Sequence, residues 1–166
     1  NKIYYERILI ETNRIIPIFN NRTFIDSEYG LMIVTAYNIW LDNRIFGVGL
    51  KNYRSVCADS KYSNINSLVV QNRCSTHPHN FYAELLSELG LSGLLLFLSI
   101  IIKLFYDLIN IYFKNKDYFL LPFIIILFFI FLPISLSSSL FNNFNILWIS
   151  YIISLTIYIS KNKYVI

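Results

Sequence analysis

Residues 74–93 read Cys-Ser-Thr-His-Pro-His-Asn-Phe-Tyr-Ala-Glu-Leu-Leu-Ser-Glu-Leu-Gly-Leu-Ser-Gly, a polar loop that leads through a short amphipathic segment into an apolar run. Pro78 disfavours helical geometry for the residue before it, so we expect a helix to start near Asn80. In this helix Glu84 and Glu88 fall on one face, and the apolar residues turn toward protein or lipid. The chain's two histidines, His77 and His79, therefore lie about three helical turns before the apolar run.

Three apolar runs follow, at residues 91–113, 119–137 and 146–160. The first is long enough to cross a hydrocarbon core of about 30 Å, and the two shorter runs need neighbouring residues or packing partners to do so. Hydrophobic residues make up 55% of the chain and charged residues 14%, whereas soluble domains average roughly 25% charged residues. The sequence predicts a mainly α fold: a polytopic membrane protein with an outer helical region at residues 1–90 and about three transmembrane helices within residues 91–166.

The connectors of these runs indicate their orientation. Residues 114–117 and 161–163 are short and basic, and such loops lie on the cytoplasmic side. This places residues 1–90 outside and the C-terminus in the cytoplasm. The net charge of +4 is spread along the chain without a basic tract, which excludes the usual nucleic-acid-binding pattern. Because no signal peptide precedes the polar region, we expect the C-terminal part of a longer protein, preceded by further transmembrane helices and inactive without them.

Two helices are predicted before the histidines. An amphipathic helix ending near Pro17 suits the membrane surface, although the tail of a preceding transmembrane helix is an alternative. A second helix spans residues 27–42, with Ser27 as its cap and Glu28 in its first turn. The apolar stripe predicted for this second helix consists of Leu31, Val34 and Tyr37, widened by Ile33, Trp40 and Leu41.

The two cysteines of the chain, Cys57 and Cys74, bound a polar loop. On the outer side of a membrane disulfides persist, and a bridge over a loop of this length would stabilise the fold by roughly 3 kcal/mol. The alternative is a metal site formed with His77 and His79. The spacing Cys-x-x-His-x-His is not a usual zinc pattern, so we expect the disulfide and no metal.

Two motifs resemble those of a known family. His79-Asn80, nine further residues, Gly90, two residues and Gly93 form a pattern similar to the histidine motif of the O-antigen ligase and polymerase family of bacterial membrane glycosyltransferases. Upstream, the segment Gly47-Val-Gly49 resembles the Gly-x-Gly element that precedes this motif in the family. The resemblance runs from about residue 25 to the end of the chain. Early in the helix at 27–42 the family often has an arginine, where this chain reads Glu28-Tyr29-Gly30.

The resemblance implies an enzyme of the bacterial inner membrane whose outer region lies in the periplasm. His79 would act as general base on an acceptor hydroxyl, of a lipid or a glycan, during transfer from a polyprenyl-diphosphate-linked glycan donor. No cofactor or metal is implied, because arginine can stabilise the leaving diphosphate. The residues expected to contact the substrate are Arg54 in first place, then Arg44, His77 and Asn80; Arg22 and Arg73 are further candidates.

Several alternatives stay open. His79 could instead be a loop residue at the start of the following helix. Ligase, polymerase and protein-glycosylating members of the family share the motif. A membrane transporter or sensor with a disulfide-linked outer loop, and without catalysis, is the alternative outside the family. The pair Lys103 and Asp107 fits a helix ion pair better than a functional site. Residues 135–145, which follow Pro133, could line a cavity or form a simple turn.

Overall fold

The computed structural model describes residues 27–65, 70–116, 118–133 and 139–161. These residues form helices and turns and contain no strand. This confirms the mainly α class. The predicted helix ending near Pro17 lies outside the described residues.

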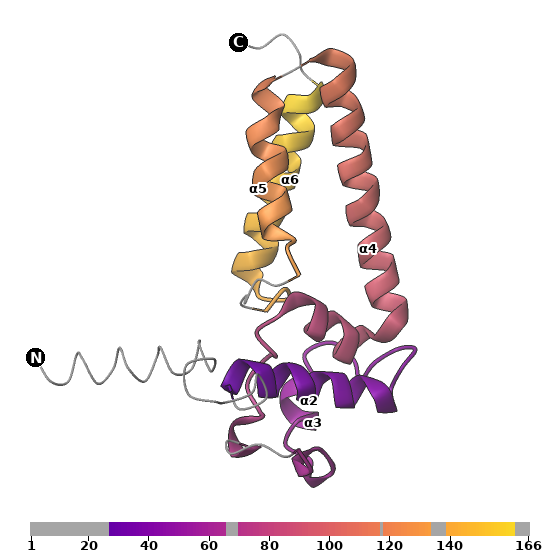
Figure 1. Cartoon of the computed structure of the whole chain (residues 1–166), viewed down its shortest axis with the longest axis vertical. Coiled ribbons are helices and arrows are strands. Elements are labelled where there is room, and N and C mark those ends of the chain that lie inside the picture. Colours follow the sequence, from indigo (N-terminus) through magenta and orange to yellow (C-terminus); the bar gives the residue numbers. More distant parts are fainter. Residues whose placement is uncertain (1–26, 66–69, 117, 134–138, 162–166) are drawn as a thin grey trace, which may run out of the picture.

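The described residues form two parts (Figure 1), and the chain passes from one to the other at the non-helical Gly90. The first, which we name the polar layer, contains α2 (Glu28–Asp42), α3 (Tyr53–Val56), the 3₁₀ turns η3 (Ser60–Ser63) and η4 (Val70–Asn72), and the first turns of α4 (Phe81–Asn115). The second, which we name the apolar bundle, contains the rest of α4, the 3₁₀ turn η5 (Tyr118–Leu120), α5 (Leu121–Ile130) and α6 (Asn143–Lys161).

Helix α2 begins as the sequence predicts, because the Ser27 hydroxyl accepts a hydrogen bond from the Gly30 amide at 3.0 Å. Its buried stripe agrees with the predicted one at Leu31, which is buried, and differs from it at Tyr37 and Leu41, which are exposed. The buried residues of α2 are Gly30, Leu31, Met32, Thr35, Ala36 and Ile39. The small side chains of this stripe let the rings of Tyr53 and Tyr62 pack against the helix, and this tertiary contact decides which face is buried.

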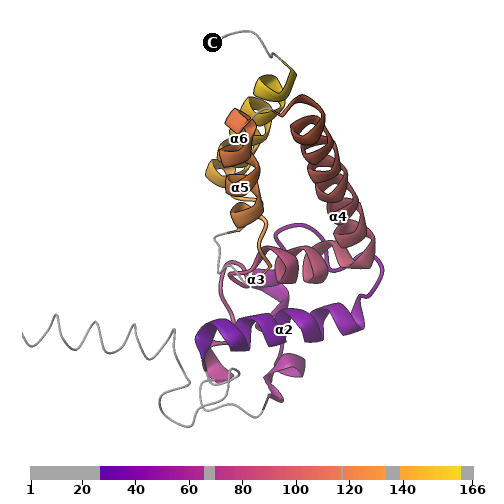
Figure 2. The ribbon, with the colours of Figure 1, turned by 45° about the horizontal axis from the view of Figure 1, so that its top comes forward.

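Helix α4 turns at Gly90. There φ is +67° and ψ is −164°, so the helix changes direction between residue 89 and residue 91. The turns before Gly90 lie across the end of the bundle, in the layer of α2, and the turns after it run along the bundle (Figures 1 and 2). Ile45 caps this turn, since its carbonyl accepts a hydrogen bond from the Ser92 amide at 3.1 Å.

The apolar bundle buries Leu108, Leu120, Leu127, Phe131 and Ile152 at its centre. Among the described residues, α4 and α6 are long and apolar enough to cross a membrane. The second predicted span is shorter than expected: residues 119–137 were predicted, whereas the helix ends at Ile130 and residues 131–133 are not helical. The side chains of Asn80 and Tyr82 donate to the carbonyls of Pro133 and Phe131, at 2.8 and 2.6 Å, and so hold this non-helical end against α4.

Candidate functional site

A pocket of about 330 Å³ lies where the polar layer meets the entry to α6. Four separate segments line it: the loop before α3 with α3 itself, residues 74–80 with the two histidines (the histidine loop), α4, and the segment that leads into α6. The lining residues are Lys51, Arg54, Thr76, His77, Glu84, Ser139, Phe141, Asn142 and Asn143. Of the two alternatives left open for residues 135–145, the described part of the segment fits the cavity lining, because Ser139, Phe141, Asn142 and Asn143 line the pocket.

The glycine segment is folded tightly onto α4. Gly47 and Gly49 have φ values of +65° and +95°, as expected for a turn that requires glycine. The amides of Val48 and Gly49 donate to the carbonyls of Ser87 and Glu88, at 3.0 and 2.8 Å. A side chain at Gly47 would overlap the backbone of Glu88. This close contact fixes the start of α3, and with it Arg54, beside the pocket.

The Glu88 carboxylate completes this contact. It is fully buried and accepts hydrogen bonds from the Lys51 amide at 2.6 Å and from the Tyr53 amide at 3.2 Å. Burial raises the pKa of Glu88, and the two amide donors oppose that effect. Glu88 lies before Gly90, in the turns of α4 that belong to the polar layer.

Glu84, one turn earlier, holds the opposite wall. It is 2% exposed, and its carboxylate accepts from the Ser139 hydroxyl at 2.5 Å and from the Leu140 amide at 2.7 Å. Burial raises the pKa of Glu84, and the bonds from Ser139 and Leu140 oppose the rise. The two glutamates therefore connect α4 to both walls of the pocket.

The two histidines contact one another. Their ring centroids are 4.2 Å apart, and the His79 ring also packs edge-on against Tyr29 at 5.2 Å. His77 lines the pocket, whereas His79 is half-buried and is not among the lining residues; its Nε2 lies 3.5 Å from the Ser75 hydroxyl. Burial, with a smaller contribution from His77, lowers the pKa of His79, so this imidazole stays neutral and able to accept a proton at neutral pH.

The backbone around His79 follows from its neighbours. His79 has φ +56°, in the left-handed region, next to the buried Pro78. Asn80 then caps α4, since its side-chain oxygen accepts from the amides of Tyr82 and Ala83 at 3.0 Å each. Asn80 was expected to contact substrate; in the structure its described bonds cap the helix and hold the carbonyl of Pro133.

The histidine loop is joined to α3 by a disulfide between Cys57 and Cys74, with the Cα atoms 5.4 Å apart. These sulfurs are thus unavailable as thiolate ligands, and among the described residues no group of three metal-ligating side chains occurs. Arg73 donates to the carbonyls of Cys57 and Ala58, both at 3.1 Å. Its guanidinium therefore braces this loop.

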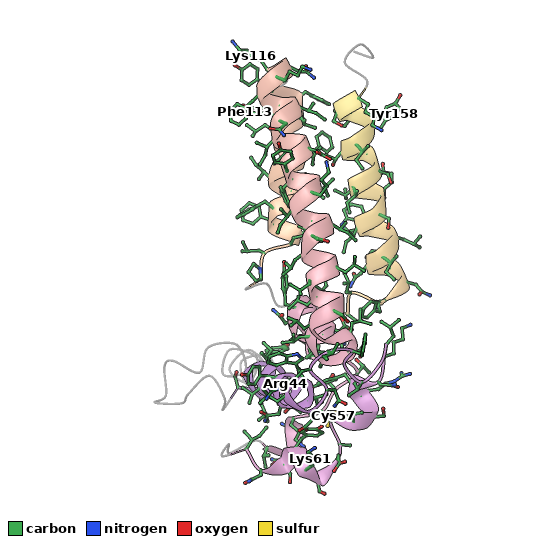
Figure 3. The ribbon with its side chains drawn as sticks, turned by 90° about the vertical axis from the view of Figure 1, so that its right-hand side faces the viewer. Arg44, Cys57, Lys61, Phe113, Lys116 and Tyr158 are labelled. Carbon is green, nitrogen blue, oxygen red and sulfur yellow. A yellow bond between two sulfur atoms is a disulfide. The ribbon has the colours of Figure 1, made fainter. Side chains whose placement is uncertain are left out.

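The structure separates the arginine candidates. Arg54 is exposed on α3 and lines the pocket. Arg44 does not line it: its side chain donates to the Leu41 carbonyl, and its own carbonyl accepts from Leu91 at the turn of α4. Figure 3 shows Arg44 at the edge of the polar layer that faces the bundle. Among the pocket's lining residues the cations beside His77 are thus Lys51 and Arg54.

Sequence reasoning did not identify Lys51, Glu84 or Glu88 as site residues. Lys51 lies four positions after Gly47 and has φ +60°. It reaches the pocket because the segment Gly47-Val-Gly49 folds onto α4. Glu84 and Glu88 had the spacing of a solvated helix face. Only the tertiary structure shows that both carboxylates accept hydrogen bonds from distant segments.

The comparisons with known proteins agree with the motifs. The family model described as O-antigen ligase matches residues 5–98, more than half of the chain, and the match includes the glycine segment, the histidine loop and Gly93. No curated protein and no solved structure matches the chain. On the family match, this chain belongs to the O-antigen ligase family.

Proposed function

We propose that this chain takes part in transferring a glycan from a polyprenyl-diphosphate donor to a hydroxyl group of a lipid or glycan acceptor. The family implies glycan transfer of the ligase or polymerase type. The observation that supports the specific reaction is the pocket in which Lys51 and Arg54 lie with His77, next to the apolar bundle. A diphosphate with a long hydrocarbon tail needs cations at its head and apolar surface along its length.

The diphosphate would bind to Lys51 and Arg54, since a guanidinium can donate to two phosphate oxygens at once. The polyprenyl chain would follow the exposed apolar side chains of α4 and α6, among them Leu95, Leu96 and Leu147. The acceptor oxygen attacks the anomeric carbon, and the bond from that carbon to the diphosphate breaks. The negative charge that develops on the leaving diphosphate is stabilised by the two cations, without a divalent metal.

His79 is our candidate for the general base that takes the proton of the acceptor hydroxyl. The neutral state favoured by its lowered pKa suits that role. His77 lines the pocket and its ring contacts that of His79, so it is the candidate for contacting the substrate directly. In this arrangement the proton leaves the acceptor oxygen and ends on the imidazole of His79.

We further propose that the polar layer faces the periplasm and that the C-terminus lies in the cytoplasm. The disulfide, which is stable in an oxidising compartment, lies in the polar layer. Lys116, from a short basic connector, lies with Phe113 and Tyr158 at the far end of the bundle from Cys57 (Figure 3). Short basic connectors favour the cytoplasmic side.

The test is glycan transfer by the full-length protein in membranes, at matched abundance, with a defined polyprenyl-diphosphate-linked glycan. We expect His79→Ala to lower the rate by at least about 100-fold. Arg54→Ala should lower it by at least about tenfold, because one charge-assisted contact to the diphosphate is lost. Arg44→Ala is the matched control, because this arginine does not line the pocket and its side chain bonds to the Leu41 carbonyl. The transfer rate of this variant should stay within about twofold of the wild-type rate.

The products distinguish the reactions: a longer lipid-linked glycan indicates a polymerase, and a glycan on a new acceptor indicates a ligase. Normal transfer by inserted His79→Ala would make His79 a structural loop residue and would contradict the base assignment. Absence of transfer by the wild-type protein with every donor tried would favour a non-catalytic transporter or sensor.

A further inference from the structure

Glu84 and Glu88 are two buried carboxylates on consecutive turns of α4, and Glu84 lines the pocket. Burying an anion is costly unless its oxygens accept strong hydrogen bonds. Here each carboxylate uses both of its oxygens, and each receives two donors from one distant segment: Lys51 and Tyr53 for Glu88, Ser139 and Leu140 for Glu84. Each glutamate is therefore bonded to a single wall of the pocket.

The donors to Glu88 are both backbone amides, one at each oxygen, at 2.6 and 3.2 Å. A backbone amide can only donate, so position 88 must present an acceptor on both sides. Glutamine cannot do this. It has one oxygen, and its NH₂ group would point a proton at one of the two amides and leave that amide buried without an acceptor.

The donors to Glu84 differ in kind. One is the Leu140 amide, but the other is the Ser139 hydroxyl, which can also accept. A glutamine at position 84 could accept from Leu140 through its oxygen and donate to Ser139 through its NH₂ group. The same isosteric change should thus be tolerated at one glutamate and not at the other.

We propose that Glu88 and Glu84 are positioning residues, each fixing one wall of the pocket, and that only Glu88 requires both carboxylate oxygens. Glu88 fixes the wall of Lys51 and Arg54, and Glu84 fixes the wall that begins at Ser139. The link from these walls to catalysis rests on the proposed function: the first wall would hold the donor diphosphate, so Glu88 would determine donor affinity without touching the donor.

The structural half of the proposal is tested by amide hydrogen exchange of the full-length protein in lipid nanodiscs. In Glu88→Gln, exchange of a peptide covering residues 47–56 should become at least about tenfold faster, as expected when buried amides lose an acceptor. A peptide covering residues 139–145 should keep its rate. In Glu84→Gln both peptides should exchange as in the wild type, and in Glu84→Ala the second peptide alone should accelerate.

Unchanged exchange of residues 47–56 in Glu88→Gln would overturn the proposal. Acceleration that extends to α2 and to both peptides would also overturn it, because Glu88 would then stabilise the whole layer rather than one wall. The tolerated variant Glu84→Gln provides a folded protein with a matched chemical change, so a general effect of replacing a buried carboxylate would be recognised.

The kinetic half uses the transfer reaction. Glu88→Gln should raise the KM for the lipid-linked donor by at least about tenfold with a smaller change in kcat. Glu84→Gln should raise this KM by a smaller factor, because the wall that Glu84 fixes carries neither Lys51 nor Arg54. If exchange at residues 47–56 accelerates while the donor KM is unchanged, the positioning role stands and the proposed diphosphate site at this wall fails. A donor KM raised equally by both glutamine variants would overturn the distinction between the two glutamates.

Discussion

The polar layer and the apolar bundle are held together by different interactions. In the polar layer, side chains bond across the fold: the buried Tyr53 hydroxyl lies 3.1 Å from the Met32 carbonyl and 3.0 Å from the Arg73 carbonyl, and Tyr62 donates to Asp42 at 2.9 Å. In the bundle, two hydroxyl groups of α6 bond within their own helix instead. Thr156 donates to the Ile152 carbonyl and Ser160 to the Ile157 carbonyl, at 2.7 and 2.8 Å.

This difference shows where the sequence is constrained. A hydrogen bond between distant segments requires a suitable residue type at one position. If its donor is exchanged for an apolar group, the acceptor stays buried without a hydrogen-bond partner. Packing of apolar helices in lipid accepts many side chains of similar size. We therefore expect substitutions in the polar layer, and at its junction with the bundle, to have larger effects than those in the bundle.

The largest effect should come from Gly90→Ala at the junction of the two parts. A methyl group there would overlap the Ile45 carbonyl, and φ of +67° is unfavourable for alanine. Strain and overpacking together should cost on the order of 4 kcal/mol. The measurement is the thermal midpoint and membrane abundance of the variant. Leu95→Ala, at an exposed site in the same helix, is the control, and equal loss in both would contradict the role of the turn.

The next effect should come from removing the disulfide of the polar layer. The double variant Cys57→Ser with Cys74→Ser should lose about 3 kcal/mol of stability, as the chain-entropy model gives for a cross-link between residues 17 positions apart. Thermal unfolding with and without reductant measures this loss. Reductant should lower the midpoint of the wild type and leave that of the double variant unchanged. An unchanged wild-type midpoint would contradict a stabilising bridge.

A smaller effect should follow substitution in the bundle. Leu127 is fully buried among its neighbours, whereas Leu147 is 71% exposed. Leu127→Ala should cost about 2 kcal/mol through lost packing, and Leu147→Ala less than about 0.5 kcal/mol. Unfolding of both variants in the same detergent gives the comparison. Equal losses would show that the bundle is not packed around Leu127.

The smallest expected effect is a pH shift within the histidine loop. Burial lowers the pKa of His79, and His77 adds to that lowering. A base must be neutral to accept a proton, so the acid limb of the pH–rate profile should lie below the ordinary histidine value of about 6.5. His77→Ala should move the limb upward, toward that value, by less than about one pH unit. A limb that stays in place would remove His77 as a cause.

Local sequence was enough to predict much of the fold. Ser27 before an apolar-periodic segment predicted the start of α2, and Asn80 after Pro78 predicted the start of α4, because caps and proline act within a few residues. The glycine turn at Gly47 and Gly49 was predicted for the same reason. Of the stripe predicted for α2, Leu31 is buried, whereas Tyr37 and Leu41 are exposed, and α5 ends at Ile130 within the predicted span; both features depend on segments distant in sequence.

The sequence by itself therefore determined the helical class, the apolar runs and the family of this chain, because composition, periodicity and short motifs are local properties. Only the tertiary structure decided that Arg54 and Lys51, rather than Arg44, lie at the pocket with His77. It alone gave Glu84 and Glu88 their partners. The physical reason is that a buried carboxylate is defined by the donors that reach it, and here those donors come from segments between 35 and 56 residues away.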